Sequence, residues 1–235
     1  MTRRAGTPRT GRAVAALALL TGLVGSVLVA PSTATADPDV LITDVSETHP
    51  FVEAIGWLAD QGITTGYPNG DGSFAFRPSD AVLREQAAAF LYRYQWGNDG
   101  DQLPGPSGFT DVSDSHRFKQ HIQWLAGEGI TKGYANGDGT FSFRTSQPVL
   151  REQVAVFLYR YHFSGPVLAA PNTSPFNDVP STHTFYQAIY WAWSVGIATG
   201  YDNGDGTFSF RPSQPVLREQ MAAFLYRYDQ HYATS

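Results

Sequence analysis

The apolar residues between positions 51 and 94 follow helical spacing over two short stretches. The first stretch places four residues on one helix face, at the i, i+4, i+7 and i+8 positions: Phe51, Ile55, Leu58 and Ala59. Gly62 follows where a left-handed C-terminal cap belongs. The pattern therefore predicts a short amphipathic helix that ends before Gly62.

A dense turn signal leads from this helix to a second one. Residues 66–72 read Gly-Tyr-Pro-Asn-Gly-Asp-Gly, and an alternating apolar segment follows at residues 74–76. A second helix is predicted from about residue 83 to about residue 94. Its apolar face consists of Leu83, Ala87, Phe90, Leu91 and Tyr94. The unit is a helix, a turn with a short extended piece, and another helix.

This unit occurs three times with a period of 67 residues and no insertion. The period relates several sets of identical residues: Asp44, Asp111 and Asp178; His49, His116 and His183; Trp57, Trp124 and Trp191; Gly66, Gly133 and Gly200; and Arg84, Arg151 and Arg218. We expect repeats at residues 41–96, 108–163 and 175–230, joined by linkers rich in Gly, Pro, Asn and Ser. One unit is too small to bury both helical stripes, so the three should pack about a common axis.

The N-terminus has the pattern of a secretory signal peptide, predicted to cover residues 1–36. Four arginines precede an uncharged run of small and apolar residues at 13–30, and Ala34-Thr35-Ala36 supplies a cleavage pattern. A membrane anchor is the alternative for this run, but its flanks favour cleavage. No later stretch is apolar enough to span a bilayer. The mature protein is therefore expected to be secreted.

Charge and composition exclude several classes of function. Without the four leader arginines, the chain keeps 12 basic and 21 acidic residues, a net charge of −9. This balance argues against binding to nucleic acid or to an anionic membrane surface. The chain has no Cys, so it has neither a Cys nucleophile nor a thiolate metal site. Its stability must come from the core, to which the 14% aromatic residues should contribute.

The repeated motifs resemble a known module. The middle unit carries Phe109-Thr110-Asp111-Val112, His116, Gly129-Ile130, Gly133-Tyr134, Phe143-Arg144 and Val149-Leu150-Arg151-Glu152-Gln153. This series is similar to the S-layer homology module, whose pattern runs F-x-D-V, H-W, G-I, G-Y-x-D-G-T-F-R-P and I-T-R-A-E. It is closest to the variant of high-GC Gram-positive bacteria, and the likeness covers nearly all of the mature chain.

The resemblance implies a fold and a function. The expected fold is mainly α, with three helix-turn-helix repeats in a pseudo-threefold bundle and short extended segments in projecting prongs. In the family, grooves between prongs hold a secondary cell wall polymer that often carries pyruvylated sugar. We therefore expect a non-catalytic protein of the cell surface or cell wall that binds an anionic glycan. The alternative is a structural, self-assembling or adaptor protein with an envelope protein as partner and no carbohydrate ligand.

The resemblance also indicates candidate ligand-binding residues. Arg84, Arg151 and Arg218 match the family arginine that contacts the polymer, and a guanidinium at a helix start suits a carboxylate or phosphate. Other candidates are the arginines seven residues earlier, the turn tyrosines and the first aspartate of each unit: Arg77, Arg144 and Arg211; Tyr67, Tyr134 and Tyr201; Asp44, Asp111 and Asp178. Alternatively, the first set of arginines ties the units together through these aspartates.

The sequence departs from the family pattern at three positions in each unit. Leu83, Leu150 and Leu217 replace the family Thr, and Gln86, Gln153 and Gln220 replace the Glu. Leucine cannot cap a helix, so the second helix must start earlier or have its end satisfied differently. The Trp that follows the family His is also missing, since Pro50, Arg117 and Thr184 occupy its place. These changes could alter the groove and its ligand.

Three other patterns are better explained by structure than by chemistry. A calcium loop on the turn would need acids where Tyr67 and Pro78 stand. The three repeated histidines have no nucleophile elbow or metal motif beside them, so they should anchor their loops near the helix start. The repeated tryptophans could stack on sugar, but they are predicted to belong to the core. We expect no catalytic residue, metal or cofactor.

Overall fold

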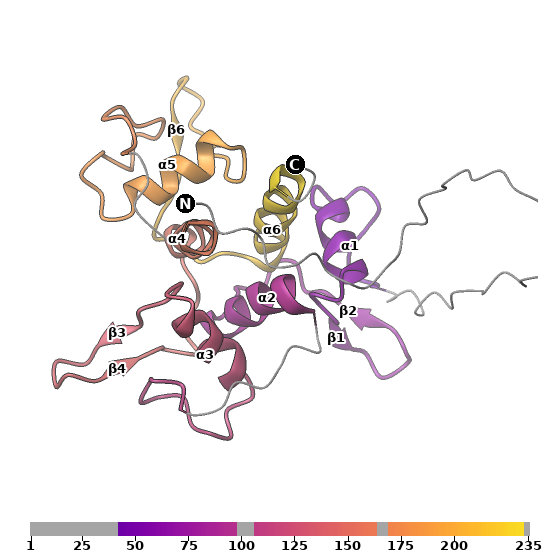
Figure 1. Cartoon of the computed structure of the whole chain (residues 1–235). Helices are drawn as coiled ribbons and strands as arrows, with labels where there is room; N and C mark the ends of the chain where they lie inside the picture. Colours follow the sequence, from indigo (N-terminus) through magenta and orange to yellow (C-terminus); the bar gives the residue numbers. More distant parts are fainter. Residues whose placement is uncertain (1–41, 98–105, 164–168, 233–235) are drawn as a thin grey trace, which may run out of the picture.

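The computed structural model describes residues 42–97, 106–163 and 169–232, so the predicted signal peptide lies outside the described residues. Within these ranges the chain forms six helices and three two-stranded hairpins (Figure 1). The elements are α1 (Val52–Asp60), β1 (Tyr67–Pro68), β2 (Phe74–Ala75), α2 (Arg84–Trp96), α3 (Lys119–Gly127), β3 (Tyr134–Ala135), β4 (Phe141–Ser142), α4 (Arg151–His162), α5 (Tyr186–Ser194), β5 (Tyr201–Asp202), β6 (Phe208–Ser209) and α6 (Arg218–Tyr232). None of these helices has the length and apolar character needed to cross a bilayer.

Each repeat has the predicted order of helix, antiparallel hairpin and helix. The first hairpin pairs Tyr67 with Ala75, and the other two keep the same register. Gly62 follows α1 with φ of +66°, the predicted left-handed cap. The turn aspartates also have a local role, because Asp71 Oδ1 accepts hydrogen bonds from the backbone N–H and the hydroxyl of Ser73. These bonds lower the pKa of Asp71.

The second helices of the three repeats form the centre of the molecule, and the first helices cover it from outside (Figure 1). Each first helix packs on the second helix of a different repeat: α3 on α2, α5 on α4 and α1 on α6. The last of these contacts joins the third repeat back to the first. The prediction of a pseudo-threefold, mainly helical body is therefore confirmed.

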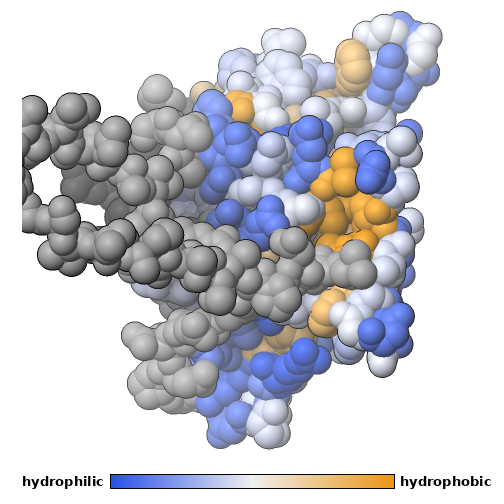
Figure 2. Space-filling model, turned by 90° about the vertical axis from the view of Figure 1, so that its right-hand side faces the viewer, coloured by the Kyte–Doolittle hydropathy of each residue, from blue (hydrophilic) through white to orange (hydrophobic). Residues whose placement is uncertain are grey.

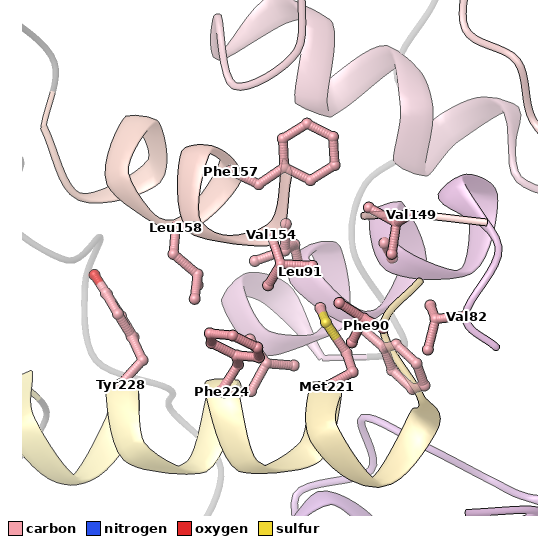
Figure 3. Packing of buried hydrophobic residues seen from close by; sticks show 14 of the residues in the cluster. Val82, Phe90, Leu91, Val149, Val154, Phe157, Leu158, Met221, Phe224 and Tyr228 are labelled. Atoms are coloured by element: carbon pink, nitrogen blue, oxygen red, sulfur yellow. The ribbon is translucent and has the colours of Figure 1, made fainter. Parts of the chain in front are cut away.

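Apolar side chains from α2, α4 and α6 point toward one another in the centre of the bundle (Figure 3). Leu91 and Leu158 are fully buried there, as is Met221. At the C-terminal end of the bundle, the rings of Tyr94, Tyr161 and Tyr228 meet with centroids 5.7–6.0 Å apart. On the face shown in Figure 2, hydrophilic residues surround a smaller hydrophobic area. The apolar stripes predicted from the sequence thus form one shared core.

The second helices begin without a side-chain cap on their first N–H groups. The Arg84 N–H donates to the carbonyl of Gln147, and the Glu85 N–H donates to that of Thr145. Leu83 does not act as a cap; instead its N–H donates to Gln86 Oε1 at 2.9 Å. The first donors of α2 are therefore satisfied by the next repeat. These two N–H groups are therefore not free to donate to an anion.

Candidate functional site

The candidate residues gather at three seams between repeats. Each seam combines an arginine at the start of a second helix with a tyrosine, an exposed arginine and a glutamine of the following repeat. The 1–2 seam has Arg84 with Tyr134, Arg144 and Gln153; the 2–3 seam has Arg151 with Tyr201, Arg211 and Gln220; the 3–1 seam has Arg218 with Tyr67, Arg77 and Gln86. The structure therefore brings together the arginine and tyrosine candidates of neighbouring repeats.

The helix-start arginines tie neighbouring repeats together. Arg84 is 3% exposed, and its Nε donates a 2.7 Å hydrogen bond to the carbonyl of Phe143 in the next repeat. Arg151 and Arg218 make the equivalent bonds to the carbonyls of Phe210 and Phe76. The predicted structural role of these arginines is present. Arg84 also donates from Nη1 to Gln153 Oε1 at 3.1 Å, and Arg151 donates from Nη2 to the carbonyl of Thr199 at 3.2 Å. Since a guanidinium has five N–H donors, two such bonds leave three donors for other partners.

The aspartates support this tie by their charge, and no hydrogen bond joins them to these arginines among the described residues. Burial lowers the pKa of Arg84, Arg151 and Arg218, and the charge of Asp111, Asp178 and Asp44, respectively, opposes that lowering. Asp111 accepts hydrogen bonds from the N–H groups of Phe143 and Arg144 in its own repeat, at 2.7 and 2.6 Å. Asp44 and Asp178 bind the equivalent pairs. These bonds hold Arg144 at a φ of +61°, an unfavourable conformation for a residue other than glycine. Each aspartate therefore shapes the end of its hairpin.

The tyrosine of each seam lies between two guanidinium groups. The Arg211 guanidinium carbon is 4.0 Å from the centroid of the Tyr201 ring, and that of Arg151 is 4.9 Å away. The Tyr201 hydroxyl accepts a 3.0 Å bond from Gln220 Nε2. Arg77, Arg144 and Arg211 are exposed, whereas the helix-start arginines are buried. The arginines at the left-handed positions are therefore the exposed cations of the seams.

Positive charge accumulates at the 2–3 seam. Burial lowers the pKa of Arg151, Tyr201 raises it, the nearby guanidinium groups of Arg211 and Arg227 lower it again, and the Asp178 carboxylate has a smaller raising effect. Arginine nevertheless keeps its charge at physiological pH. Burial also lowers the pKa of Arg227. Three cationic side chains thus influence one another at this seam, which favours a bound anion.

A cavity of about 110 Å³ opens at the 2–3 seam. Residues of all three repeats line it: Phe51, Arg151, Thr199, Gly200, Tyr201, Gln220, Ala223, Phe224 and Arg227. The lining contains two guanidinium groups and no carboxylate. Arg227 was not among the residues predicted from the sequence, although Arg93, Arg160 and Arg227 recur with the repeat period. That recurrence on the second helix was the available signal.

Histidine and glutamate pair across the seams. His116 Nε2 lies 3.4 Å from Glu85 Oε2, and the other seams repeat the contact as His183–Glu152 and His49–Glu219. His116 Nδ1 accepts a hydrogen bond from the Phe118 N–H at the start of α3. Nε2 therefore carries the hydrogen that faces the glutamate. The histidines anchor their loops near the helix start, as predicted.

The repeated tryptophans lie in or against the core. Trp124 and Trp191 are buried, and Trp57 is half-buried with its ring 5.7 Å from that of Tyr226. This confirms the core assignment for the two buried residues and shows a core contact for the third. Among the described residues, no group of three His, Cys, Asp or Glu side chains has an arrangement that could hold a metal ion.

The three repeats match the S-layer homology domain at residues 41–88, 108–155 and 175–222, together more than half of the chain. The chain is therefore a member of the S-layer homology domain family, with three tandem modules. This is the class that the helical pairs and the threefold closure define.

Similar proteins from several bacteria contain comparable segments. A cell surface protein of Thermoanaerobacter kivui is 32% identical over 121 residues, which cover 51% of this chain and 15% of that protein. The cellulosome-anchoring protein of Acetivibrio thermocellus is 24% identical over 156 residues, or 64% of this chain and 32% of that protein. An endoglucanase of a Bacillus species is 28% identical over 190 residues, or 77% of this chain and 18% of that enzyme. The chain thus spans about a third or less of each relative.

Family and relatives together identify a secreted protein of the cell surface or cell wall and support an anchoring role there. The match to the endoglucanase is no evidence for catalysis, because it takes in 18% of that enzyme.

Proposed function

We propose that the seams between repeats bind an anionic glycan of the cell wall, and that the 2–3 seam is a principal binding site. The observation that carries this proposal is the cavity in which Arg151 and Arg227 contribute positive charge and no lining residue contributes a carboxylate. An acidic group in this cavity would reduce the repulsion between the two guanidinium groups. A sugar-borne carboxylate, such as that of a pyruvyl group, or a phosphate could accept paired N–H bonds there.

The exposed arginines supply a second set of contacts. Arg211 stacks on Tyr201 and is exposed, so it can meet a polymer that enters the seam from outside. A charge-assisted hydrogen bond contributes about 1.5–3 kcal/mol, so two of them at one seam give weak binding. Three seams acting on one polymer can raise the affinity about 100- to 10,000-fold through effective concentration. Repetition of the module thus supports anchoring.

The test is retention of the protein on purified cell wall. We expect Arg211→Gln to weaken retention about tenfold and the combined Arg77→Gln, Arg144→Gln and Arg211→Gln variant to abolish it. Lys119→Gln is the matched control. It also removes one positive charge, but Lys119 is the first residue of α3 and pairs with Asp114. Retention by the native protein should fall as salt rises, because ions screen exposed charges.

Two results would contradict the proposal. Retention of the folded triple variant at the native level would show that these cations are not the contact. Self-association that rises with protein concentration and does not depend on the wall would support the structural or adaptor alternative.

A further inference from the structure

The third repeat has a second cavity, next to the one at the 2–3 seam. Its volume is about 380 Å³, and it is lined by Pro175, Phe176, Trp193, Gly196, Ala198, Thr199, Gly200 and Phe208. None of these side chains is charged. Trp193 is 40% exposed and Phe208 is 45% exposed, so two large aromatic surfaces are accessible to solvent in one place. Exposed aromatic surface around a hollow is characteristic of a binding site.

The indole of Trp193 is held in place although it is exposed. Its ring packs against Tyr190, with centroids 5.5 Å apart, and against Phe176 at 6.4 Å in an edge-to-face arrangement. An aromatic ring fixed in this way loses little conformational freedom when a ligand packs on it. The cavity therefore presents a preformed apolar platform.

This platform belongs to the third repeat alone among the described repeats. Ala59 and Ala126 occupy the positions that correspond to Trp193. Thr64 and Thr131 correspond to Ala198, and their hydroxyl oxygens accept hydrogen bonds from the backbone within their own turns. The third repeat has thus gained an indole and lost a hydroxyl at one cavity. Both changes make its surface more apolar and aromatic.

The two cavities share part of their lining. Thr199 and Gly200 line both of them, with the arginine-lined cavity on one side and the Trp193 platform on the other. A polymer whose acidic unit sits beside Arg151 would have its neighbouring unit next to this platform. That unit would meet aromatic carbon and no charge. The C–H groups of a sugar ring carry slight positive charge and can pack on the electron-rich face of an indole.

We propose that the Trp193–Phe208 cavity is a subsite for an uncharged sugar ring of the wall polymer, adjacent to the acidic unit held at the 2–3 seam. This inference rests on the proposed function. It makes the 2–3 seam an extended site that reads two consecutive units of different chemistry. The other two seams lack the indole and would read the acidic unit alone.

The test compares two probes in calorimetric titrations. One is the purified wall polymer, and the other is a fragment from its partial hydrolysis that carries one acidic unit and no neighbouring sugar. We expect Trp193→Ala to weaken binding of the polymer about tenfold and to leave binding of the fragment unchanged. Arg227→Gln should weaken binding of both. Trp96→Ala is the matched control, because Trp96 is 52% exposed at the end of α2 and lies outside both cavities.

The outcomes separate the two proposals. If Trp193→Ala binds the polymer as the native protein does while Arg227→Gln weakens both probes, the sugar subsite is overturned and the anionic site stands. If neither variant weakens either probe, the function of the 2–3 seam is itself contradicted. If Trp193→Ala instead lowers self-association in sedimentation experiments, the platform seats a second copy of the chain, which also overturns the subsite. Phe208→Ala, at an exposed hairpin position, repeats the test should Trp193→Ala fold poorly.

Discussion

The backbone N–H of Val149 donates a 2.8 Å hydrogen bond to the carbonyl of Val82, and this bond is one side of a closed ring. The Val216 N–H donates to Val149, and the Val82 N–H donates to Val216, at 2.9 and 2.8 Å. All three valines are fully buried. The three repeats are therefore joined at the axis by bonds that none of them can make alone.

This ring, together with the packing of each first helix on another repeat, predicts that the three repeats unfold as one unit. In scanning calorimetry we expect one transition whose calorimetric enthalpy equals its van't Hoff enthalpy. The amide hydrogens of the three valines should exchange only through global unfolding. Three separable transitions would contradict the prediction.

Asp111→Ala should destabilise the protein by about 2–3 kcal/mol, because it removes two charge-assisted bonds to the N–H groups of Phe143 and Arg144. Urea unfolding at neutral pH measures the loss. Asp138→Ala is the control, since that carboxylate binds Thr140 within an exposed turn. Its substitution should have a clearly smaller effect, and equal losses would sink the explanation.

The two arginine types should differ in how much they contribute to stability. Arg151→Ala is expected to lower the free energy of unfolding by about 2–3 kcal/mol, because it removes a donor from the buried Phe210 carbonyl. Arg211→Gln should leave stability within about 0.5 kcal/mol of native, since its side chain is exposed. Urea midpoints of both variants provide the check. A large loss from Arg211→Gln would mean that stacking on Tyr201 is structural.

Gly133 and Gly137 form a matched pair for a test of the hairpin. A Cβ at Gly133 would lie 2.3 Å from the ring of Phe109 and 2.9 Å from the Ser142 carbonyl oxygen, at a φ of +67°. Gly133→Ala should cost about 2–4 kcal/mol from overpacking and strain. Gly137 has a φ of +87° and open space, so Gly137→Ala should cost about 1 kcal/mol. Thermal unfolding would reveal the difference, and similar melting temperatures would refute it.

His121 should make the protein sensitive to mild acid. Burial, with a smaller effect of the Arg93 guanidinium, lowers the pKa of His121 to about 4 from an ordinary value of 6.5. Between these two pH values the unfolded chain binds a proton that the folded protein does not. Stability contributed by neutral His121 is therefore present above pH 6.5 and is lost as the pH falls toward 4.

The matched variant is His121→Ala, because Ala54 and Ala188 occupy the equivalent positions in the other repeats. Its urea midpoint should fall less than that of the native protein between pH 7 and pH 5. Burial and His231 also lower the pKa of His162. This residue is present in both proteins, so the difference between them isolates His121. Parallel pH profiles would disprove the assignment.

Helical spacing in the sequence was sufficient to predict the two helices of each repeat. The stripe that includes Leu58 and the one that includes Leu91 point to the core because a buried face must recur every three or four residues. Gly62 was placed correctly because few residues other than glycine adopt a left-handed cap. These signals are local, and a single unit carries all of them.

Contacts between repeats were harder to predict, because their partners are backbone groups. The acceptor for Arg84 is the carbonyl of Phe143, and every residue has a carbonyl. The same holds for Asp111, whose partners are two N–H groups. The period of 67 residues shows that the units are equivalent but does not specify which neighbour each one touches. Arg227 is an example, since the cavity that it lines is completed by Phe51 of the first repeat.

The docking of α1 on α6 sets a limit on how this protein can evolve by duplication. Three units bring the first described helix back to the last, so each first helix packs on a second helix and every valine at the axis has both a donor and an acceptor. A chain of two units would leave one face and one edge open, and a fourth unit would have no place in the circle. Growth of such a protein must therefore add complete sets of three, or unrelated segments outside the closed body.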